Sequence, residues 1–138
     1  MDIQIKPFQL EEIHRADVEE LLFQLSGKER RVSLENHPGA YNIGAFDGNK
    51  LVGFAQIFIL PKTTFTFGLL EDVVVDEKYR GRGIGERIIL EAISLAKSKS
   101  ADRINLTSRQ ERTEARKLFE SLGFTQQETD VFRLEFKM

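Results

Sequence analysis

The 138-residue sequence predicts a single α+β domain, residues 1–138, built on a mostly antiparallel sheet. Three observations support this fold class. Two apolar runs in residues 41–60 are joined by Asp47-Gly48-Asn49, a turn typical of a hairpin. The run Val73-Val74-Val75 is typical of a central strand covered on both faces. Beyond it helix and strand patterns alternate, and no linker, repeat or low-complexity tract divides the chain.

The elements of the first half follow in order. Ile3, Ile5 and Phe8 suggest an edge strand that stops near Pro7. A helix is expected next, because four apolar residues have the spacing of one helical face: Val18, Leu21, Leu22 and Leu25. We expect Asp17 as its N-cap and Gly27 just past its end. Residues 28–38 are weakly patterned and predict a loop or a short second helix. The hairpin strands follow at residues 41–46 and 51–60.

The second half combines strands and helices. A strand is expected over residues 64–75, a helix over residues 83–99 and a short strand over residues 104–107. Ser108 to Glu111 has the form of a capping box, which predicts a helix beginning there and closed by Gly123. Residues 124–127 and 131–136 resemble a terminal hairpin.

Composition restricts the functions that the chain can have. Its 20 Lys and Arg against 22 Asp and Glu show no basic excess, so no nucleic-acid partner is expected. The absence of Cys excludes thiolate catalysis, and His14 and His37 lack a metal-ligand spacing, so no metal is expected. No apolar stretch approaches the ~20 residues that span a bilayer, and no leader or lipidation motif is visible. We therefore expect a cytoplasmic protein without membrane contact.

The most informative segment is a glycine-rich turn between a buried strand and an amphipathic helix. Three alternating glycines, Gly81, Gly83 and Gly85, are interleaved with Arg82 and preceded by Arg80. The unpaired N–H groups and positive dipole end of a helix attract an anion, and glycine lets the backbone approach it. The pattern therefore predicts a phosphate-binding turn. The alternative is that the glycines only turn the chain and the arginines are solvated.

Two other phosphate-binding motifs do not fit this turn. A dinucleotide fingerprint needs a third glycine where this chain has Glu86. A P-loop needs Gly-Lys followed by Ser or Thr, and no such tripeptide occurs.

The turn instead resembles the signature of the GNAT superfamily of N-acetyltransferases, [Arg/Gln]-x-x-Gly-x-[Gly/Ala], which Arg80-Gly81-Arg82-Gly83-Ile84-Gly85 matches. The preceding segment, residues 70–77, looks like the central strand of that family. Residues 115–124 are similar to its second motif, Ala-x-x-Leu-Tyr-x-x-x-Gly-Phe. The resemblance covers about the last half of the chain specifically. It implies a mixed, mostly antiparallel central sheet with helices on both faces.

The resemblance also implies acetyl-CoA as the co-substrate and direct transfer of its acetyl group to a primary amine. The backbone from Arg80 to Gly85, including Ile84, would hold the diphosphate. Val73, Val74 and Val75 would pair with the pantetheine arm like an added strand, and an N–H near Val73 would polarise the thioester carbonyl. A bulge in this strand is typical of the family and opens the slot for the cofactor.

The reaction requires that a protonated amine lose a proton, which a nearby carboxylate can accept. Glu71 occupies the strand position where several family members carry their base, and Asp72 follows it. Neighbouring strand residues point to opposite faces, so we expect only one of them, Glu71, to face the cleft. The alternative is a structural carboxylate that pairs with an arginine.

The chain departs from the family pattern where the second motif usually carries Tyr, because Phe119 cannot protonate the leaving thiolate. We expect Phe119 to pack near the cofactor. Arg112 replaces a common Asn and either contacts phosphate or an acidic acceptor group, or is solvated. Ser108 is expected to be an N-cap near the cofactor slot.

We expect a small-molecule amine as acceptor, because no acidic run suggests docking of a basic tail. A peptidyl lysine or N-terminus remains compatible, and the sequence leaves a homodimer open. The alternative function is a non-catalytic acyl-CoA-binding sensor or regulatory module. A third, weaker alternative is nucleic-acid binding through four basic residues: Lys78, Arg80, Arg82 and Arg87.

Overall fold

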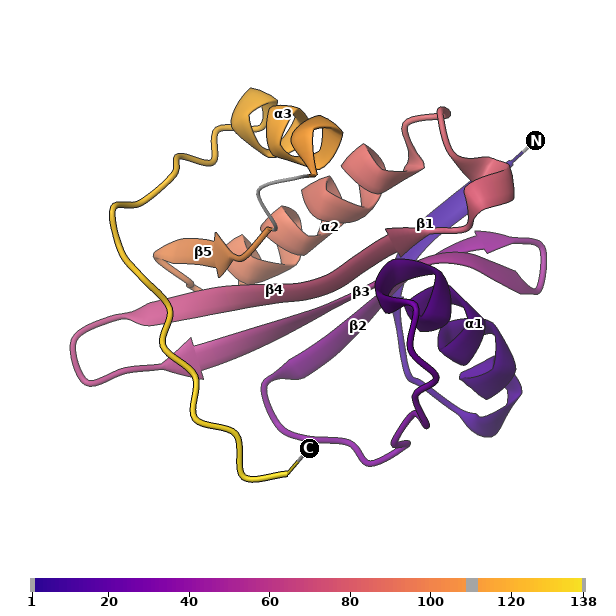
Figure 1. Ribbon diagram of the computed structural model, residues 1–138, viewed down its shortest axis with the longest axis horizontal. Coiled ribbons are helices and arrows are strands. Elements are labelled where there is room, and N and C mark those ends of the chain that lie inside the picture. Colours follow the sequence, from indigo (N-terminus) through magenta and orange to yellow (C-terminus); the bar gives the residue numbers. More distant parts are fainter. Residues whose placement is uncertain (1, 109–111, 138) are drawn as a thin grey trace. The chain divides into compact units, whose positions relative to one another are not determined.

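The computed structural model describes residues 2–108 and 112–137, which fall into two compact units. The first unit is Met1–Thr107 and the second is Ser108–Met138 (Figure 1). The helices and strands of the first unit are β1 (Ile3–Phe8), α1 (Arg15–Ser26), β2 (Ala40–Asp47), β3 (Lys50–Pro61), β4 (Thr66–Val75), α2 (Ile84–Ser98) and β5 (Arg103–Leu106), with short 3₁₀ turns η1 (Glu12–His14) and η2 (Glu77–Tyr79). The second unit contains α3 (Thr113–Ser121).

The first unit is built on a five-stranded sheet in the order β1-β2-β3-β4-β5. The pairs from β1 to β4 are antiparallel, and β5 runs parallel to β4. The parallel pair requires a crossover, which α2 provides. The predicted mostly antiparallel sheet is therefore confirmed.

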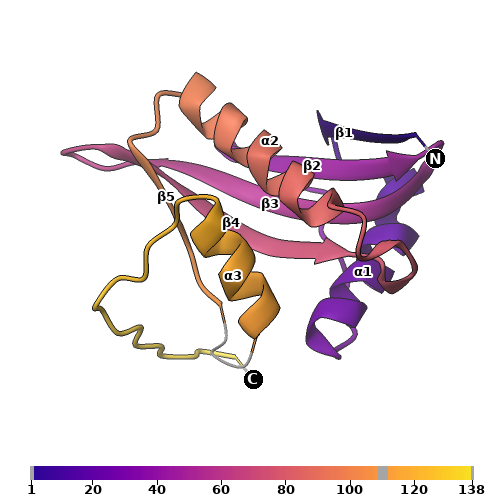
Figure 2. The ribbon, with the colours of Figure 1, turned by 90° about the horizontal axis from the view of Figure 1, so that it is seen from above.

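Helices cover both faces of this sheet (Figure 2). On one face, Val18 and Leu21 of α1 join a buried cluster with Phe54 of β3 and Val74 of β4. On the other face α2 lies so close that a Cβ added at Gly53 would meet the side chain of Ile88 at 2.8 Å. These contacts confirm the predicted α+β arrangement.

Helix α1 begins earlier than the sequence predicts. Its N-cap is His14, and Asp17 lies inside the first turn, so the prediction of Asp17 as N-cap is wrong. The reason is that η1 runs directly into α1 with a capping box of its own, formed by Glu11 and His14. Asp17 instead accepts a hydrogen bond at 3.1 Å from the backbone N–H of Leu51, at the start of β3. Gly27 ends the helix in a left-handed conformation, as predicted.

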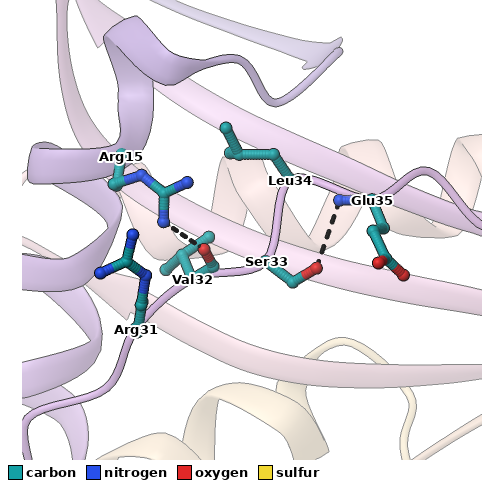
Figure 3. Close-up of a pocket in the computed structure, with 6 residues that line it drawn as sticks. All are labelled: Arg15, Arg31, Val32, Ser33, Leu34 and Glu35. Carbon is teal, nitrogen blue, oxygen red and sulfur yellow. Dashed lines mark hydrogen bonds between the residues drawn. The ribbon is translucent and has the colours of Figure 1, made fainter.

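The segment between α1 and β2 is a loop, and a second helix does not form there. Two side chains of α1 form hydrogen bonds with the backbone of one loop residue, Val32. Glu19 accepts from the N–H of Val32 at 2.9 Å, and Arg15 donates to the carbonyl of the same residue (Figure 3). The side chains of Val32 and Leu34 pack against the buried cluster under α1. The loop is therefore attached to the helix face rather than coiled into a helix.

The second unit differs from the sequence prediction at both ends. α3 begins at Thr113 with Arg112 as N-cap, so Ser108 is not the N-cap of this helix. Glu111, the other half of the predicted capping box, lies outside the described residues. No strand forms among residues 124–137, so the predicted terminal hairpin is wrong. An isolated two-stranded hairpin is marginal in water without a third strand or a packed apolar face.

Within residues 2–108 and 112–137, no helix combines the length and the apolar character that crossing a bilayer requires.

The first prediction concerns the link between α1 and the sheet. Asp17→Ala should lower the free energy of unfolding by about 1–3 kcal/mol, because it leaves the partly buried N–H of Leu51 without its acceptor. Chemical denaturation measures this. Glu20→Ala, at an exposed position of the same helix, should change the free energy by less than about 0.5 kcal/mol. Equal effects of the two substitutions would contradict the proposed link.

Candidate active site

The centre of the candidate site is a β-bulge in β4. Phe54 of β3 pairs with Val74, but Gln56, two residues further along β3, pairs with Glu71, which is three residues back along β4. The register therefore shifts by one residue, and β4 contains one more residue than β3 across this stretch. Asp72 absorbs the extra residue with a φ of +58°, in the left-handed region.

The bulge determines the face that Glu71 occupies. Phe54 and Gln56 share a face because they are two residues apart on the regular strand β3. Cross-strand partners also share a face, so Glu71 lies on the same face as Gln56 and Phe54, which is the face that α1 covers. Glu71 is half-buried there, while Asp72 is exposed. The two carboxylates are therefore in different environments.

The surroundings of Glu71 hold its proton more tightly than water does. Burial raises the pKa of the Glu71 carboxyl above its ordinary value, and the negative charge of Asp72 raises it further. Both effects disfavour the ionised form. A carboxylate with a raised pKa is a stronger proton acceptor, which suits it to general base catalysis.

A row of polar side chains crosses three strands at the level of Glu71. Asn42 of β2 pairs with Gln56 of β3, which pairs with Glu71 of β4. The side-chain amide of Gln56 donates to the side-chain oxygen of Asn42 at 3.1 Å. The orientation of the Gln56 amide is thus fixed beside the carboxylate.

The sequence interpretation missed Asn42 and Gln56 because their alignment depends on a second irregularity. The tight turn pairs Asp47 with Lys50, and counting back from that pair would place Asn42 opposite Ala55. A register shift between Ala45 and Phe46 moves Asn42 opposite Gln56 instead. A shift of one residue changes the face on which a pair meets, and the apolar pattern alone does not reveal it.

The glycine-rich turn follows directly from the end of β4. Buried Asp76 accepts from the N–H of Lys78 at 3.0 Å and so caps η2. Gly81 and Gly83 both have positive φ, +79° and +75°, and Gly83 is the N-cap of α2. A residue with a side chain is strained in this conformation, which explains why glycine stands at both positions.

The turn leaves open space where an anion would lie. A Cβ added at Gly81 or at Gly83 would meet no atom within 4 Å. At Gly85, in contrast, the added atom would lie 3.7 Å from the side chain of Val75, so this glycine faces the strand. The first turn of α2, with its unpaired N–H groups, begins at this open space. Binding of a phosphate group at this turn stays a prediction. Ile84, the first residue of α2, is buried.

The arginines of the turn have contacts within the domain. Arg80 donates to the carbonyl of Val75 at 3.0 Å, and Arg87 of α2 donates to the carbonyl of Ile3 at 2.8 Å. These bonds join the turn to β4 and α2 to β1.

Figure 3 shows a hollow beside α1, in the loop that precedes β2. Its volume is about 610 Å³, and its lining consists of Arg15, Arg31, Val32, Ser33, Leu34 and Glu35. The lining includes none of the site residues predicted from the sequence. The hollow therefore belongs to the loop between α1 and β2.

Three predicted site residues, Ser108, Arg112 and Phe119, belong to the second unit. The ring of Phe119 meets that of Phe124 edge-on, with the ring centroids 6.1 Å apart. Phe119 therefore packs within its own unit, and its role near a cofactor stays a prediction. The predicted roles of Ser108 and Arg112 near the cofactor also stay predictions. Within the described residues, no cluster of three or more His, Asp or Glu side chains could hold a metal.

Comparisons with known proteins agree with this geometry. The sequence model described as the acetyltransferase (GNAT) family matches residues 5–124. Glucosamine 6-phosphate N-acetyltransferase from Trypanosoma brucei brucei is 35% identical over 85 residues, which are 59% of this chain and 56% of that protein. N-alpha-acetyltransferase RimI from Mycobacterium tuberculosis is 33% identical over 87 residues, 63% of this chain and 53% of that protein. The chain thus matches about half the length of these curated relatives.

A solved structure extends the similarity to the whole fold. The crystal structure of a Trypanosoma brucei acetyltransferase superposes with a TM-score of 0.82 at 28% identity, covering 98% of this chain and 100% of that one. The Arabidopsis thaliana glucosamine-6-phosphate N-acetyltransferase shares the fold at 17% identity, with a TM-score of 0.77 and coverage of 99% and 100%. Since the family model spans most of the chain, the protein belongs to the acetyltransferase (GNAT) family.

Proposed function

We propose that the protein is an acetyl-CoA-dependent N-acetyltransferase that acts on a primary amine of a small molecule. The observation that carries the proposal is the bulge in β4, which holds a half-buried carboxylate, Glu71, on the strand that leads into the glycine-rich turn. In a chain of the acetyltransferase (GNAT) family, this combination supplies both a proton acceptor and a phosphate site.

Acetyl-CoA supplies an activated acetyl group and a diphosphate by which it can be held. The backbone N–H groups between Arg80 and Gly85 would bind the diphosphate, because the space above Gly81 and Gly83 is open. The strand residues Val73, Val74 and Val75 would pair with the pantetheine arm. The sheet supports this role, since β5 pairs with β4 only from Phe67 to Leu70, and no strand of the described residues pairs with the other edge of β4 beyond Leu70.

Glu71 would act as the general base. An alkylammonium group has a pKa of about 10 and carries no free electron pair, so a proton must leave before attack. The carboxylate accepts that proton, directly or through a water molecule. The nitrogen then attacks the carbonyl carbon of the thioester, a C–N bond forms, and the C–S bond breaks. An N–H near Val73 would stabilise the negative oxygen of the intermediate.

The leaving thiolate would take its proton from solvent. Phe119 has no proton to give, and the two tyrosines are poorly suited as acids. Tyr41 pairs with Ile57, on the face opposite to that of Glu71. The hydroxyl of Tyr79 already donates to Asp47 at 2.7 Å. A thiol pKa near about 8.5 makes the thiolate a fair leaving group without a dedicated acid.

The acceptor would lie against the polar row of Asn42, Gln56 and Glu71. An amine needs oxygen acceptors for its N–H groups, and the Gln56 side chain has an oxygen while its nitrogen is engaged by Asn42. The relatives leave the acceptor class open, because one is named for glucosamine 6-phosphate and another is named an N-alpha-acetyltransferase. We favour a small molecule, since no acidic run offers a docking site for a basic peptide.

A second candidate function is a binding module that holds acyl-CoA without transferring the acyl group. Phe119, in place of the usual tyrosine, is the observation that favours it. Incubation with acetyl-CoA and a library of amines, followed by mass spectrometry, distinguishes the two. Acetylated product supports the transferase, whereas tight binding with no product on any amine supports the module.

Replacement of the proposed base gives the second prediction. Glu71→Gln should lower kcat at neutral pH by about 10²–10⁴, with acetyl-CoA affinity nearly unchanged. The variant's rate should rise with pH as the amine loses its own proton. In the wild type, the rate should rise with pH through the raised pKa of Glu71, above the range of an ordinary carboxyl.

Stability provides the control for this variant. Because the folded pKa of Glu71 is raised, ionisation of Glu71 opposes folding at neutral pH, and the glutamine variant should unfold at an equal or higher temperature. Full activity across the pH range would remove Glu71 from the role of base.

The third prediction concerns the phosphate-binding turn. Gly83→Ala places a Cβ at a φ of +75° and should weaken acetyl-CoA binding by about tenfold or more, because the strain of about 1–2 kcal/mol distorts the N–H groups. Calorimetry measures the affinity. Gly27→Ala is a matched control, since Gly27 has a φ of +73° and equally open surroundings at the end of α1. Equal affinities in the two variants would argue against the turn as the binding site.

The fourth prediction tests the polar row. With an amine identified by the library screen, Gln56→Leu should raise the KM for that amine by about two- to tenfold, the loss of one hydrogen bond. The affinity for acetyl-CoA should not change. Gln24→Leu is unsuitable as a control because Gln24 contacts the turn, so Gln127→Leu in the second unit serves instead. An unaltered KM in Gln56→Leu would exclude the residue from acceptor binding.

A further inference from the structure

A tyrosine joins the phosphate-binding turn to a distant part of the sheet. The hydroxyl of Tyr79, at the end of η2, donates a hydrogen bond to the carboxylate of Asp47 at 2.7 Å. Asp47 is the last residue of β2, 32 positions earlier in the chain. The guanidinium carbon of Arg82 lies over the ring of the same tyrosine, 5.3 Å from its centroid. Tyr79 therefore connects a fixed carboxylate with a cation of the turn.

The two ends of this connection differ in how firmly they are held. Asp47 pairs with Ile3 on one side and with Lys50 on the other, so both neighbouring strands hold its backbone. The turn from Arg80 to Gly83 is exposed throughout. An exposed side chain in such a turn stays in one orientation only where another group holds it. The hydrogen bond from a neutral phenol to an ionised carboxylate is charge-assisted, which makes it a strong anchor.

The ring of Tyr79 restricts where the Arg82 side chain can point. A guanidinium is attracted to the face of an aromatic ring and stacks on it. Arg82 stands between Gly81 and Gly83, at the open space where an anion would lie. Its planar fork of N–H donors matches two oxygens of a phosphate group. Stacking would hold that fork in place before a ligand arrives and so reduce the entropy lost on binding.

We propose that Tyr79 is a positioning residue that, anchored by Asp47, orients Arg82 toward the phosphate groups of the CoA substrate. The inference rests on the proposed function, because it assumes that acetyl-CoA binds at this turn. Tyr79 touches neither the acetyl group nor the amine, and its whole effect passes through Arg82. The affinity that it contributes should therefore depend on Arg82 and on the ligand's phosphates.

The chain provides a matched control in its other tyrosine. The ammonium group of Lys99 lies over the ring of Tyr41, 5.2 Å from its centroid, which is nearly the geometry of Arg82 over Tyr79. Lys99 follows the last turn of α2, at the opposite end of the helix from the phosphate-binding turn. Tyr41→Leu thus removes a similar cation–π contact without touching the turn.

The experiment is a double-mutant cycle read by calorimetry with acetyl-CoA. Arg82→Gln should weaken binding by about tenfold, as expected for a lost hydrogen bond to a charged group. Tyr79→Leu should weaken it by about two- to fivefold. In the Arg82→Gln background, Tyr79→Leu should cause no further loss, because its effect acts through that arginine. Tyr79→Phe keeps the ring and loses the hydrogen bond to Asp47, so it should weaken binding less than Tyr79→Leu does. It replaces the leucine variant in the cycle if that variant does not fold. Tyr41→Leu should bind as the wild type does.

A second readout separates positioning from a general loss of structure. Acetyl-pantetheine carries the same thioester but lacks the nucleotide and the diphosphate. Its use as acetyl donor should be the same in the wild type and in the Tyr79 variants. The dependence of acetyl-CoA affinity on salt concentration should also be weaker in Tyr79→Leu, since fewer charged contacts form.

The outcomes distinguish the inference from the function on which it rests. Additive losses in the double variant, or an equal loss with acetyl-pantetheine, would overturn the positioning role while leaving the transferase in place. Wild-type affinity for acetyl-CoA in both Tyr79 variants would also overturn the positioning role and leave the transferase in place. A wild-type chain that does not bind acetyl-CoA would overturn the proposed function and the inference together.

Discussion

The extra residue in β4 is the constraint on which the rest of the candidate site depends. It places Glu71 on the face of Gln56 and Phe54, so that the carboxylate stands beside the polar row. It also interrupts the regular pairing of β4 with β3 shortly before the strand ends at the phosphate-binding turn. The energetic cost falls on Asp72, whose φ of +58° strains a residue with a side chain by about 1–2 kcal/mol. Aspartate tolerates this conformation better than most residues do, which gives the position a structural reason for its identity.

The same aspartate contributes to the chemistry of its neighbour. Its negative charge adds to the effect of burial in raising the pKa of Glu71. Both effects oppose folding while Glu71 is ionised, so the arrangement trades stability for a carboxylate that holds a proton more readily. A buried arginine partner would stabilise the carboxylate but lower its pKa, and it would thus weaken the base. Within the described residues, no ion pair to Glu71 is found.

Sequence reasoning could predict the parts of the fold that local chemistry determines. The Asp47-Gly48-Asn49 turn, the left-handed Gly27 and the start of α2 after Gly83 all follow from residue types at fixed offsets, and the structure confirms each. Features that depend on pairing between distant segments could not be predicted. Asp17 bonds to a strand residue 34 positions away. The alignment of Asn42 with Gln56 depends on one shift of register, and that of Gln56 with Glu71 depends on another. The predicted hairpin of residues 124–127 and 131–136 is wrong for the same reason. Alternating apolar residues form a strand only where a neighbouring strand or a packed apolar face is present to pair with them.

The glycine-rich turn shows why a local motif can predict a candidate site but not the strength of its binding. Its glycines make an anion site conceivable, yet the turn itself is exposed, and its conformation depends on residues far away in the chain. Gln24 of α1 accepts from the N–H of Glu77 at 3.0 Å. Arg87 of α2 donates to β1, 84 positions away. None of these partners lies within the motif. The affinity of the turn for an anion should therefore follow the stability of the N-terminal half of the sheet, so that substitutions in α1 or β2 can weaken binding without approaching the ligand.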